Sequence, residues 1–416
     1  MKTTMTVLVA LLFAQLAAAH EPGPPGFLDG RLQRIDNAIN AEISIGKIPG
    51  AVALIMKDGD VAYHKSFGVA DIDSGTPMQT DSIFRIASMT KAITSVAAMT
   101  LYERGYFRLN DPIAKYLPEF GDMRVVSAVD DDGNVVTTVP AKNPIRVIHL
   151  LTHTAGLGYP FVPSQVQKAY VDAGIIDGMT ARDVDLASQM SLLASQPLLF
   201  EPGEQFAYGL NTDLLGYFVE VVSGKLLDDY FAEEIFEPLG MNDTYFYLPD
   251  DKADRLVTLY AAVDEGLVVS QGDEADIKLD DPRYPVAGAR RYFSGGAGLS
   301  STAHDYARFL QMLLNDGELD GARILGRKSV ELMRTARVDW DGDEAPDFGL
   351  GFMVVSDIGK HGEIGSPGTY AWGGAFNTTY WIDPVEKLVA VYMSQARPTK
   401  SDMGDRFSTL VYQALE

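Results

Sequence analysis

Apolar residues change their spacing along the chain, and the first stretch predicts a helix followed by strands. They recur at helical intervals over residues 28–45. Two segments rich in aliphatic and aromatic residues follow, 51–57 and 61–69, and the Asp58-Gly59-Asp60 turn between them predicts a hairpin. A further apolar stretch predicts a helix that begins near residue 88 and runs to about Gly105.

The middle of the chain, about residues 112–290, mostly follows helical spacing and is interrupted by loops and by a predicted hairpin at 125–139. After a glycine-rich segment at 294–299, another helix is predicted over 305–316. The chain then returns to strands and closes with a helix from about residue 402. The predicted strands cover residues 349–356, 378–384 and 387–394.

Strand-forming segments at both ends, with helical segments between them, predict one α+β unit. We expect an antiparallel sheet built from both chain ends and flanked by helices, formed by residues of about 27–111 and 291–416. The residues between, about 112–290, would form an inserted, mostly helical subdomain of the same catalytic domain, 27–416. A cleft between the two parts is the natural place for a ligand.

The first nineteen residues differ from the rest. Lys2 is followed by an apolar run, Val7 to Ala19, that ends in three alanines, as expected of a secretory signal peptide at about 1–19. We therefore predict export to the periplasm or the medium, with no membrane attachment after cleavage. The alternative is a retained anchor, although the run is short for a bilayer span.

Composition narrows the possible chemistry. The 416 residues include no cysteine, which excludes disulfides, thiolate metal sites and cysteine nucleophiles. The net charge of −23 disfavours nucleic acid and anionic membranes as partners. Acidic runs at 129–134, 273–281 and 339–344 are interpreted as solvated loops, and the last lacks the glycine of a calcium-binding loop at its sixth position, where Glu344 stands.

Ser88 and Lys91 stand three residues apart in a predicted buried helix, so their side chains share one face. Desolvation disfavours the charged form of a buried lysine, and a neutral lysine beside a serine is a competent general base. The same spacing occurs by chance at Ser44 and Lys47, where the helix is ending and both residues look exposed. The surroundings therefore favour Ser88 as the nucleophile.

Two other chemistries, a Ser-His-Asp triad and a metal site, lack their usual motifs in this sequence. The Gly-x-Ser-x-Gly elbow of α/β-hydrolases is missing from the sequence. His149 and His153 have the spacing of a metal pair, but no His-Glu-x-x-His motif is present. We expect these histidines to brace a turn beneath the core, and we predict no metal and no cofactor.

Several blocks, in the same order, resemble the class C β-lactamase-like serine hydrolases and, within them, the family VIII carboxylesterases. FRIASMTKAITS (84–95) is similar to the Ser-x-x-Lys block, and FAYGLNTDLLGYF (206–218) is similar to the tyrosine block. YAWGGAFNTTYWIDP (370–384) occupies the place of the third catalytic motif. The resemblance covers most of the chain after residue 27.

This resemblance implies a role for each site residue. Ser88 would be acylated, Lys91 would be its base and Tyr208 would relay the proton to the leaving alcohol. The backbone N–H groups of Ser88 and Ala375 would form the oxyanion hole. Three further residues would line the edge strand and contact the substrate: Trp372, Gly373 and Gly374.

Two positions depart from the β-lactamase pattern. Leu210 stands where those enzymes have the asparagine that holds the substrate amide, so it is a candidate substrate contact of another kind. Asn211 follows it and is expected to point elsewhere. Trp372 replaces the lysine that binds the substrate carboxylate, and an indole cannot provide that positive charge.

The sequence therefore predicts a serine carboxylesterase that cleaves short-chain esters, or small lactones, through an acyl-serine intermediate. The partner is a small-molecule ester, and the sequence leaves the oligomeric state open. The alternatives are a β-lactamase or D-Ala-D-Ala peptidase, an acyltransferase that uses the same acyl-enzyme, and a non-catalytic protein with this fold.

Overall fold

The computed structural model describes residues 24–416 except 177, 272–281 and 340–346. The predicted signal segment, the whole 273–281 run and most of the 339–344 run therefore lie outside the described residues. Among the described helices, none combines the length and the apolar character that a bilayer span requires.

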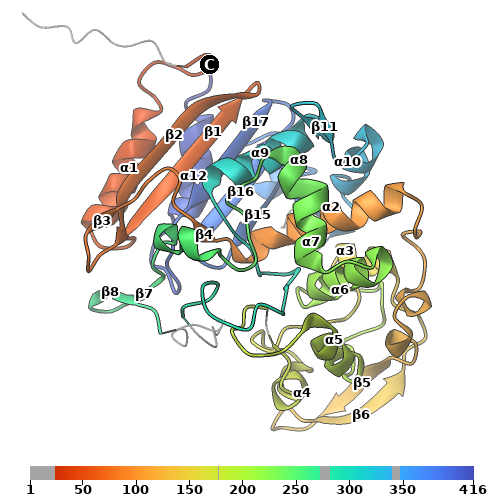
Figure 1. Cartoon of the computed structure of the whole chain (residues 1–416). Coiled ribbons are helices and arrows are strands. Elements are labelled where there is room, and N and C mark those ends of the chain that lie inside the picture. The colour runs from red at the N-terminus through yellow and green to blue at the C-terminus, as the bar shows by residue number, and fades with distance from the viewer. Residues whose placement is uncertain (1–23, 177, 272–281, 340–346) are drawn as a thin grey trace, which may run out of the picture.

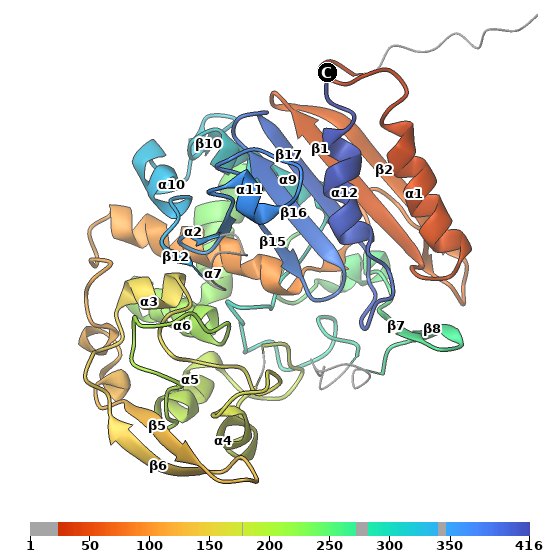
Figure 2. The ribbon, with the colours of Figure 1, turned by 180° about the vertical axis from the view of Figure 1, so that it is seen from behind.

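A nine-stranded sheet forms the centre of the molecule, and its middle joins the two ends of the chain (Figures 1 and 2). Strand β1 pairs antiparallel with β2 on one side and with β17 on the other, so Leu54 faces His64 and Val391. The strands in spatial order are β12 (Val338–Asp339), β13 (Asp347–Phe348), β14 (Met353–Val354), β15 (Tyr370–Gly374), β16 (Thr378–Asp383), β17 (Leu388–Met393), β1 (Gly50–Lys57), β2 (Asp60–Asp71) and β3 (Thr76–Pro77).

Helices cover both faces of this sheet, which explains why β1 is apolar at every position from Ala51 to Met56. Helices α1 (Gln33–Ser44) and α12 (Met403–Tyr412) pack on one face against alternate residues such as Ala53 and Ile55. Helices α2 (Thr90–Glu103) and α9 (Ala303–Leu314) pack on the other face against Val52 and Leu54. Strands buried on both faces lose the alternation of a half-exposed sheet.

The segment between the two halves of the sheet contains more helix than strand, and several of its helices lie along α2 (Figure 1). Its hairpin is the predicted one, β5 (Arg124–Val129) and β6 (Val135–Pro140). Its helices are α3 (Val147–Leu151), α4 (Gln167–Asp172), α5 (Leu186–Ala194), α6 (Asn211–Ser223), α7 (Leu227–Phe231) and α8 (Glu237–Leu239), and a second hairpin is formed by β7 (Tyr260–Val263) and β8 (Gly266–Val269). The predicted α+β architecture is confirmed.

The remaining short elements connect these layers. They are β4 (Phe84–Arg85), which pairs with β9 (Ser300–Ser301), β10 (Glu318–Leu319), which pairs with β11 (Ala322–Arg323), and the helices α10 (Arg327–Met333) and α11 (Ile358–His361).

Two predicted elements are shorter in the structure. The first helix begins at Gln33 rather than at residue 28, because the chain turns at Gly30, which has a positive φ of 69°. The predicted strand 349–356 is reduced to β14, since Gly351 also has a positive φ and lies against α2. A Cβ at Gly351 would stand 2.2 Å from the Ser95 hydroxyl oxygen, so close approach to α2 requires glycine there.

Candidate active site

Ser88 lies in a tight turn between β4 and α2. The turn is a 3₁₀ helix, Ala87–Met89, that precedes α2 directly. Ala87 is fully buried and has a φ of +43°, a conformation that non-glycine residues rarely adopt. Such strain persists only where the surrounding core enforces it, and it is common at functional sites. The turn leaves Ser88 partly exposed between two buried neighbours, Ala87 and Met89.

Lys91 lies one turn further along, and its side chain is buried. Its side-chain nitrogen Nζ donates to the carbonyl oxygen of Gly296 at 2.7 Å and lies 3.2 Å from the hydroxyl oxygen of Ser88, within hydrogen-bond distance. The same nitrogen lies 4.7 Å from the ring centre of Tyr208. The contact with Gly296 holds the lysine side chain in place, and the contact with Ser88 puts its nitrogen next to the serine oxygen.

Tyr208 completes the group from the loop before α6. Its hydroxyl donates to the Ser88 oxygen at 2.7 Å. The indole nitrogen of Trp372 in turn donates to the Tyr208 hydroxyl oxygen at 3.4 Å, and the two rings lie 5.5 Å apart. The structure thus brings together the three residues that the motifs suggested, Ser88, Lys91 and Tyr208, with Trp372 against the tyrosine.

Asp213 is a residue of this site that the sequence analysis missed. It lies on α6, fully buried, and its carboxylate accepts hydrogen bonds from the Ser294 hydroxyl at 2.5 Å and from the Gly296 backbone N–H at 3.2 Å. Burial raises the pKa of the Asp213 carboxyl, while the nearby Lys91 charge acts to lower this pKa. The carboxylate therefore fixes the loop whose Gly296 carbonyl holds Lys91.

The contact between the loop and the Asp213 carboxylate requires glycine at position 296. A Cβ there would lie 2.3 Å from a carboxylate oxygen of Asp213, so the loop can approach the carboxylate only without a side chain. The one signal in the sequence was an aspartate among the apolar residues of the predicted helix around 213. A buried carboxylate generally needs a partner, and here its partners come from a loop that lies 81 residues away along the chain.

Strand β15 forms the opposite wall. It pairs with β14 through Tyr370 and Ala371, and the ladder with β14 ends before Trp372, whereas pairing with β16 continues to Gly374. A Cβ at Gly374 would lie 2.3 Å from the Ile86 carbonyl oxygen, so the strand approaches the serine turn through a glycine. The predicted edge strand is therefore internal to the sheet at its start, and only its end extends beyond the pairing with β14.

A cleft of about 560 Å³ opens between these walls. Ser88 and Tyr208 line it together with Trp372, and Phe161 and Met353 add apolar surface. The other lining residues are Ala371, Gly373, Gly374, Ala375, Asn377, Thr378, Thr379, Arg397, Gly404 and Asp405.

Leu210 is the one predicted contact that lies apart from this cleft. It is fully buried at the start of α6, packs in the main core, and is not among the residues that line the cleft. Asn211 also turns inward, where its amide lies 3.1 Å from the His153 ring nitrogen. The described cleft therefore presents no amide group at the place where β-lactamases carry their asparagine.

The two histidines serve the structure. His149 accepts from the Arg146 backbone N–H at 3.2 Å, and burial lowers the pKa of His149 to about 4. His153 is buried against the Tyr208 ring, and burial holds the pKa of His153 well below its usual range. Within the described part of the chain, no cluster of three or more potential ligands could hold a metal ion.

Comparison with known proteins identifies the family to which the chain belongs. Residues 35–413 match the family model described as Beta-lactamase. The chain belongs to the β-lactamase family. It is 36% identical over 392 residues to Protein Rv1367c of Mycobacterium tuberculosis, covering 90% of this chain and 91% of that protein.

Two further relatives are an esterase and a hydrolase, which points to a narrower group within the family. The chain is 32% identical to Esterase EstB of Burkholderia gladioli over 366 residues, covering 84% of this chain and 86% of the relative. Among solved structures it resembles EstCE1, described as a hydrolase with promiscuous acyltransferase activity. The TM-score is 0.79 at 30% identity, with 92% of this chain and 98% of that chain covered. These relatives confirm the resemblance to family VIII carboxylesterases within the β-lactamase-like fold.

Proposed function

We propose that this β-lactamase-family serine hydrolase cleaves short-chain carboxylic esters, or small lactones, through an acyl-Ser88 intermediate. The contact of the Ser88 hydroxyl with both Lys91 and Tyr208 carries the proposal. The similarity to EstB and EstCE1 supports the substrate class.

In the proposed acylation step, the Ser88 oxygen attacks the ester carbonyl carbon while neutral Lys91 takes the serine proton. The carbonyl oxygen becomes an oxyanion, for which we propose the backbone N–H groups of Ser88 and Ala375 as donors. When the C–O bond to the alcohol breaks, Tyr208 gives its proton to the departing alkoxide and is reprotonated from Lys91. Deacylation repeats the sequence with water in place of the alcohol.

The presence of Trp372 favours the proposal that the substrates are esters rather than β-lactams. An indole offers an apolar face and one N–H donor, and here that N–H is directed at Tyr208. No cation therefore comes from position 372 to bind the carboxylate of a β-lactam or of a D-Ala-D-Ala end. Penicillin turnover at rates comparable to ester turnover would contradict this assignment.

Acyl transfer to an alcohol other than water is the second candidate. EstCE1 is described as a hydrolase with promiscuous acyltransferase activity, and the acyl-enzyme proposed here could likewise react with water or with an alcohol. Adding an alcohol acceptor to the ester assay and measuring the new ester separates transfer from hydrolysis.

The decisive experiment compares turnover of p-nitrophenyl butyrate and nitrocefin by the wild type, Ser88→Ala and Ser44→Ala. Ser44 is a matched control because it also precedes a lysine by three residues. Its hydroxyl lies at the end of α1, where it donates to the Ala41 carbonyl oxygen. We expect ester cleavage to disappear in Ser88→Ala and to persist in Ser44→Ala. Ester cleavage that survives in Ser88→Ala would overturn the proposal.

We also propose that the chain is exported, on the basis of the apolar run Val7 to Ala19 and the alanines that end it. Expression of the full chain with mass determination of the protein outside the cytoplasm tests this. A product that starts near residue 20 supports the proposal, and retention of the intact chain in the cytoplasm contradicts it.

A further inference from the structure

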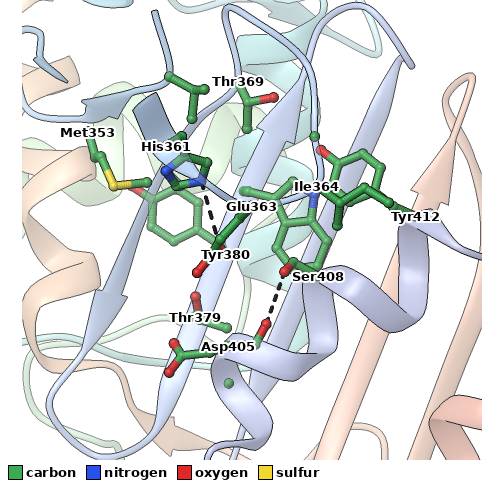
Figure 3. Close-up of a pocket in the computed structure, with 15 residues that line it drawn as sticks. Met353, His361, Glu363, Ile364, Thr369, Thr379, Tyr380, Asp405, Ser408 and Tyr412 are labelled. Atoms are coloured by element: carbon green, nitrogen blue, oxygen red, sulfur yellow. Dashed lines mark hydrogen bonds and ion pairs between the residues drawn. The ribbon is translucent and has the colours of Figure 1, made fainter. Parts of the chain in front are cut away.

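A second pocket lies behind β15 and β16, on the sheet face covered by α12 (Figure 3). Its volume is about 140 Å³. Helix α12 contributes Ser408 and Tyr412, and the segment around α11 contributes His361 and Ile364. Ser88, Lys91 and Tyr208, which carry the proposed reaction, do not line this pocket.

The second pocket borders the catalytic cleft. The cleft and the pocket share residues of the sheet and of the first turn of α12, so the two hollows lie next to each other there. The shared residues are Met353, Ala371, Thr379, Gly404 and Asp405.

Two glycines stand at this border. Gly373 lies in the part of β15 that extends beyond its pairing with β14, and a Cβ there would touch only the Thr378 carbonyl oxygen, at 3.1 Å. A Cβ at Gly404 would meet the Asn377 amide oxygen at 3.4 Å and the Thr379 methyl group at 3.9 Å. Because neither residue carries a side chain, positions 373 and 404 place no side chain between the cleft and the second pocket.

The position of Tyr208 decides which half of an ester faces the second pocket. In the proposed mechanism Tyr208 protonates the departing alcohol, so the alcohol oxygen must lie within hydrogen-bond reach of the Tyr208 hydroxyl. Trp372 lies against that hydroxyl, and Ala371 and Gly373 are its neighbours on β15. The carbonyl oxygen, by contrast, is assigned to the N–H groups at Ser88 and Ala375, beyond Gly374.

We propose that the second pocket binds the far end of the leaving alcohol, which passes from Ser88 past the end of β15. This inference rests on the proposed esterase function and names its substrate class: esters of extended, uncharged alcohols. The walls are mainly apolar, from Met353, Val355, Ile364, Trp381 and Tyr412. They fit alkyl or aryl groups.

The carboxylates at the pocket disfavour acidic alcohols. Asp405 is exposed at the border with the cleft, and Glu363 is more than half exposed beside His361, 3.7 Å from it (Figure 3). Two carboxylates at the opening repel a negatively charged group.

The test fills the pocket and leaves the catalytic residues untouched. Ser408 lines the second pocket but not the cleft, and Ser408→Leu places a larger apolar side chain in it. Thr409→Leu is the matched control, since Thr409 is the next residue of α12 and is exposed. Ile364→Trp fills the same pocket from the α11 side and serves if Ser408→Leu does not fold.

Three substrates separate the two halves of the ester: methyl butyrate, hexyl butyrate and methyl octanoate. For Ser408→Leu we expect kcat/KM for hexyl butyrate to fall about tenfold, the effect of about two methylene groups losing their burial. Methyl butyrate and methyl octanoate should be unaffected, and Thr409→Leu should behave as the wild type.

An equal response of all three esters would overturn the proposal. A selective loss with methyl octanoate would also overturn it, because the pocket would then take the acyl chain. Failure of the esterase proposal itself appears differently, as an absence of Ser88-dependent turnover of methyl butyrate in the wild type, and would overturn both.

Discussion

The indole N–H of Trp372 is directed at the hydroxyl oxygen of Tyr208, 3.4 Å away. This contact occupies a lone pair of the tyrosine oxygen, so the tyrosine proton is directed at Ser88. The residue that replaces the lysine of β-lactamases therefore orients the proposed proton relay.

Trp372→Phe should lower kcat/KM for p-nitrophenyl butyrate about threefold to tenfold, as expected for loss of one neutral hydrogen bond. The same substitution in a Tyr208→Phe background should have little further effect, because its hydrogen-bond acceptor is then gone. A full additive loss in the double variant would contradict the coupling.

Lys91→Ala should lower the rate of acylation by about 10²–10⁴, the usual contribution of a general base. Tyr208→Phe should retain more of the acylation rate and shift the pH–rate profile. Stopped-flow measurement of the p-nitrophenol burst checks both variants. Acylation by Lys91→Ala at a rate near that of the wild type would exclude Lys91 as the initiating base.

Asp213→Asn should reduce kcat/KM about tenfold to a hundredfold, because it removes a charged hydrogen-bond acceptor that positions the Gly296 loop. Asp213 acts through Lys91, so the acidic limb of the pH–rate profile should move to lower pH when the stabilising negative charge is lost. A change in thermal stability with an unchanged profile would leave Asp213 with a structural role alone. Ser294→Ala removes one hydrogen bond and keeps the charge, and should move the profile less.

Gly374→Ala and Gly373→Ala form a matched pair on one strand. The added Cβ at 374 would collide with the Ile86 carbonyl and the Thr378 hydroxyl, both at 2.3 Å, whereas the Cβ at 373 has its nearest contact at 3.1 Å. We expect Gly374→Ala to lower kcat/KM more than a hundredfold by moving β15 away from the serine turn. Gly373→Ala should cost far less, and equal losses would argue against this account.

Glu220 gives a pH-dependent stability that is independent of catalysis. Its carboxylate accepts from the Leu227 backbone N–H at 2.9 Å, and burial raises the pKa of Glu220 to about 7. Because the pKa is raised on folding, the folded chain binds more protons than the unfolded chain between about pH 4.5 and 7, so stability falls as pH rises through this window.

Glu220→Gln keeps an acceptor for the Leu227 N–H and removes the ionisation. It should raise the free energy of unfolding by about 1–3 kcal/mol at pH 8 and by almost nothing at pH 4. Urea unfolding at the two pH values measures the difference. An equal change at both would show that ionisation of Glu220 is not the cause.

The sequence predicted the sheet strands well where apolar runs were uninterrupted, as in β1 and β17, because strands buried on both faces leave a strong local signal. The strand around Gly351 was overestimated, since its course depends on contact with Ser95 on α2. Local patterns do not contain such tertiary contacts.

In the candidate site, too, some residues could be predicted from local sequence and others depend on tertiary contacts. Ser88 and Lys91 share a local motif, and Tyr208 came from the resemblance to a family. Asp213 and the burial of Leu210 depend on how α6 packs against distant loops, which spacing alone does not reveal.

The position of β1 between β2 and β17 also has a consequence for biosynthesis. While the chain is being made, β1 and β2 can pair early, but the other edge of β1 has no partner until Leu388–Met393 leaves the ribosome. An apolar strand with an open edge is a template for pairing between nascent chains. High-level expression should therefore favour aggregation before the last strand is complete, and slower translation or a holding chaperone should raise the yield of active protein.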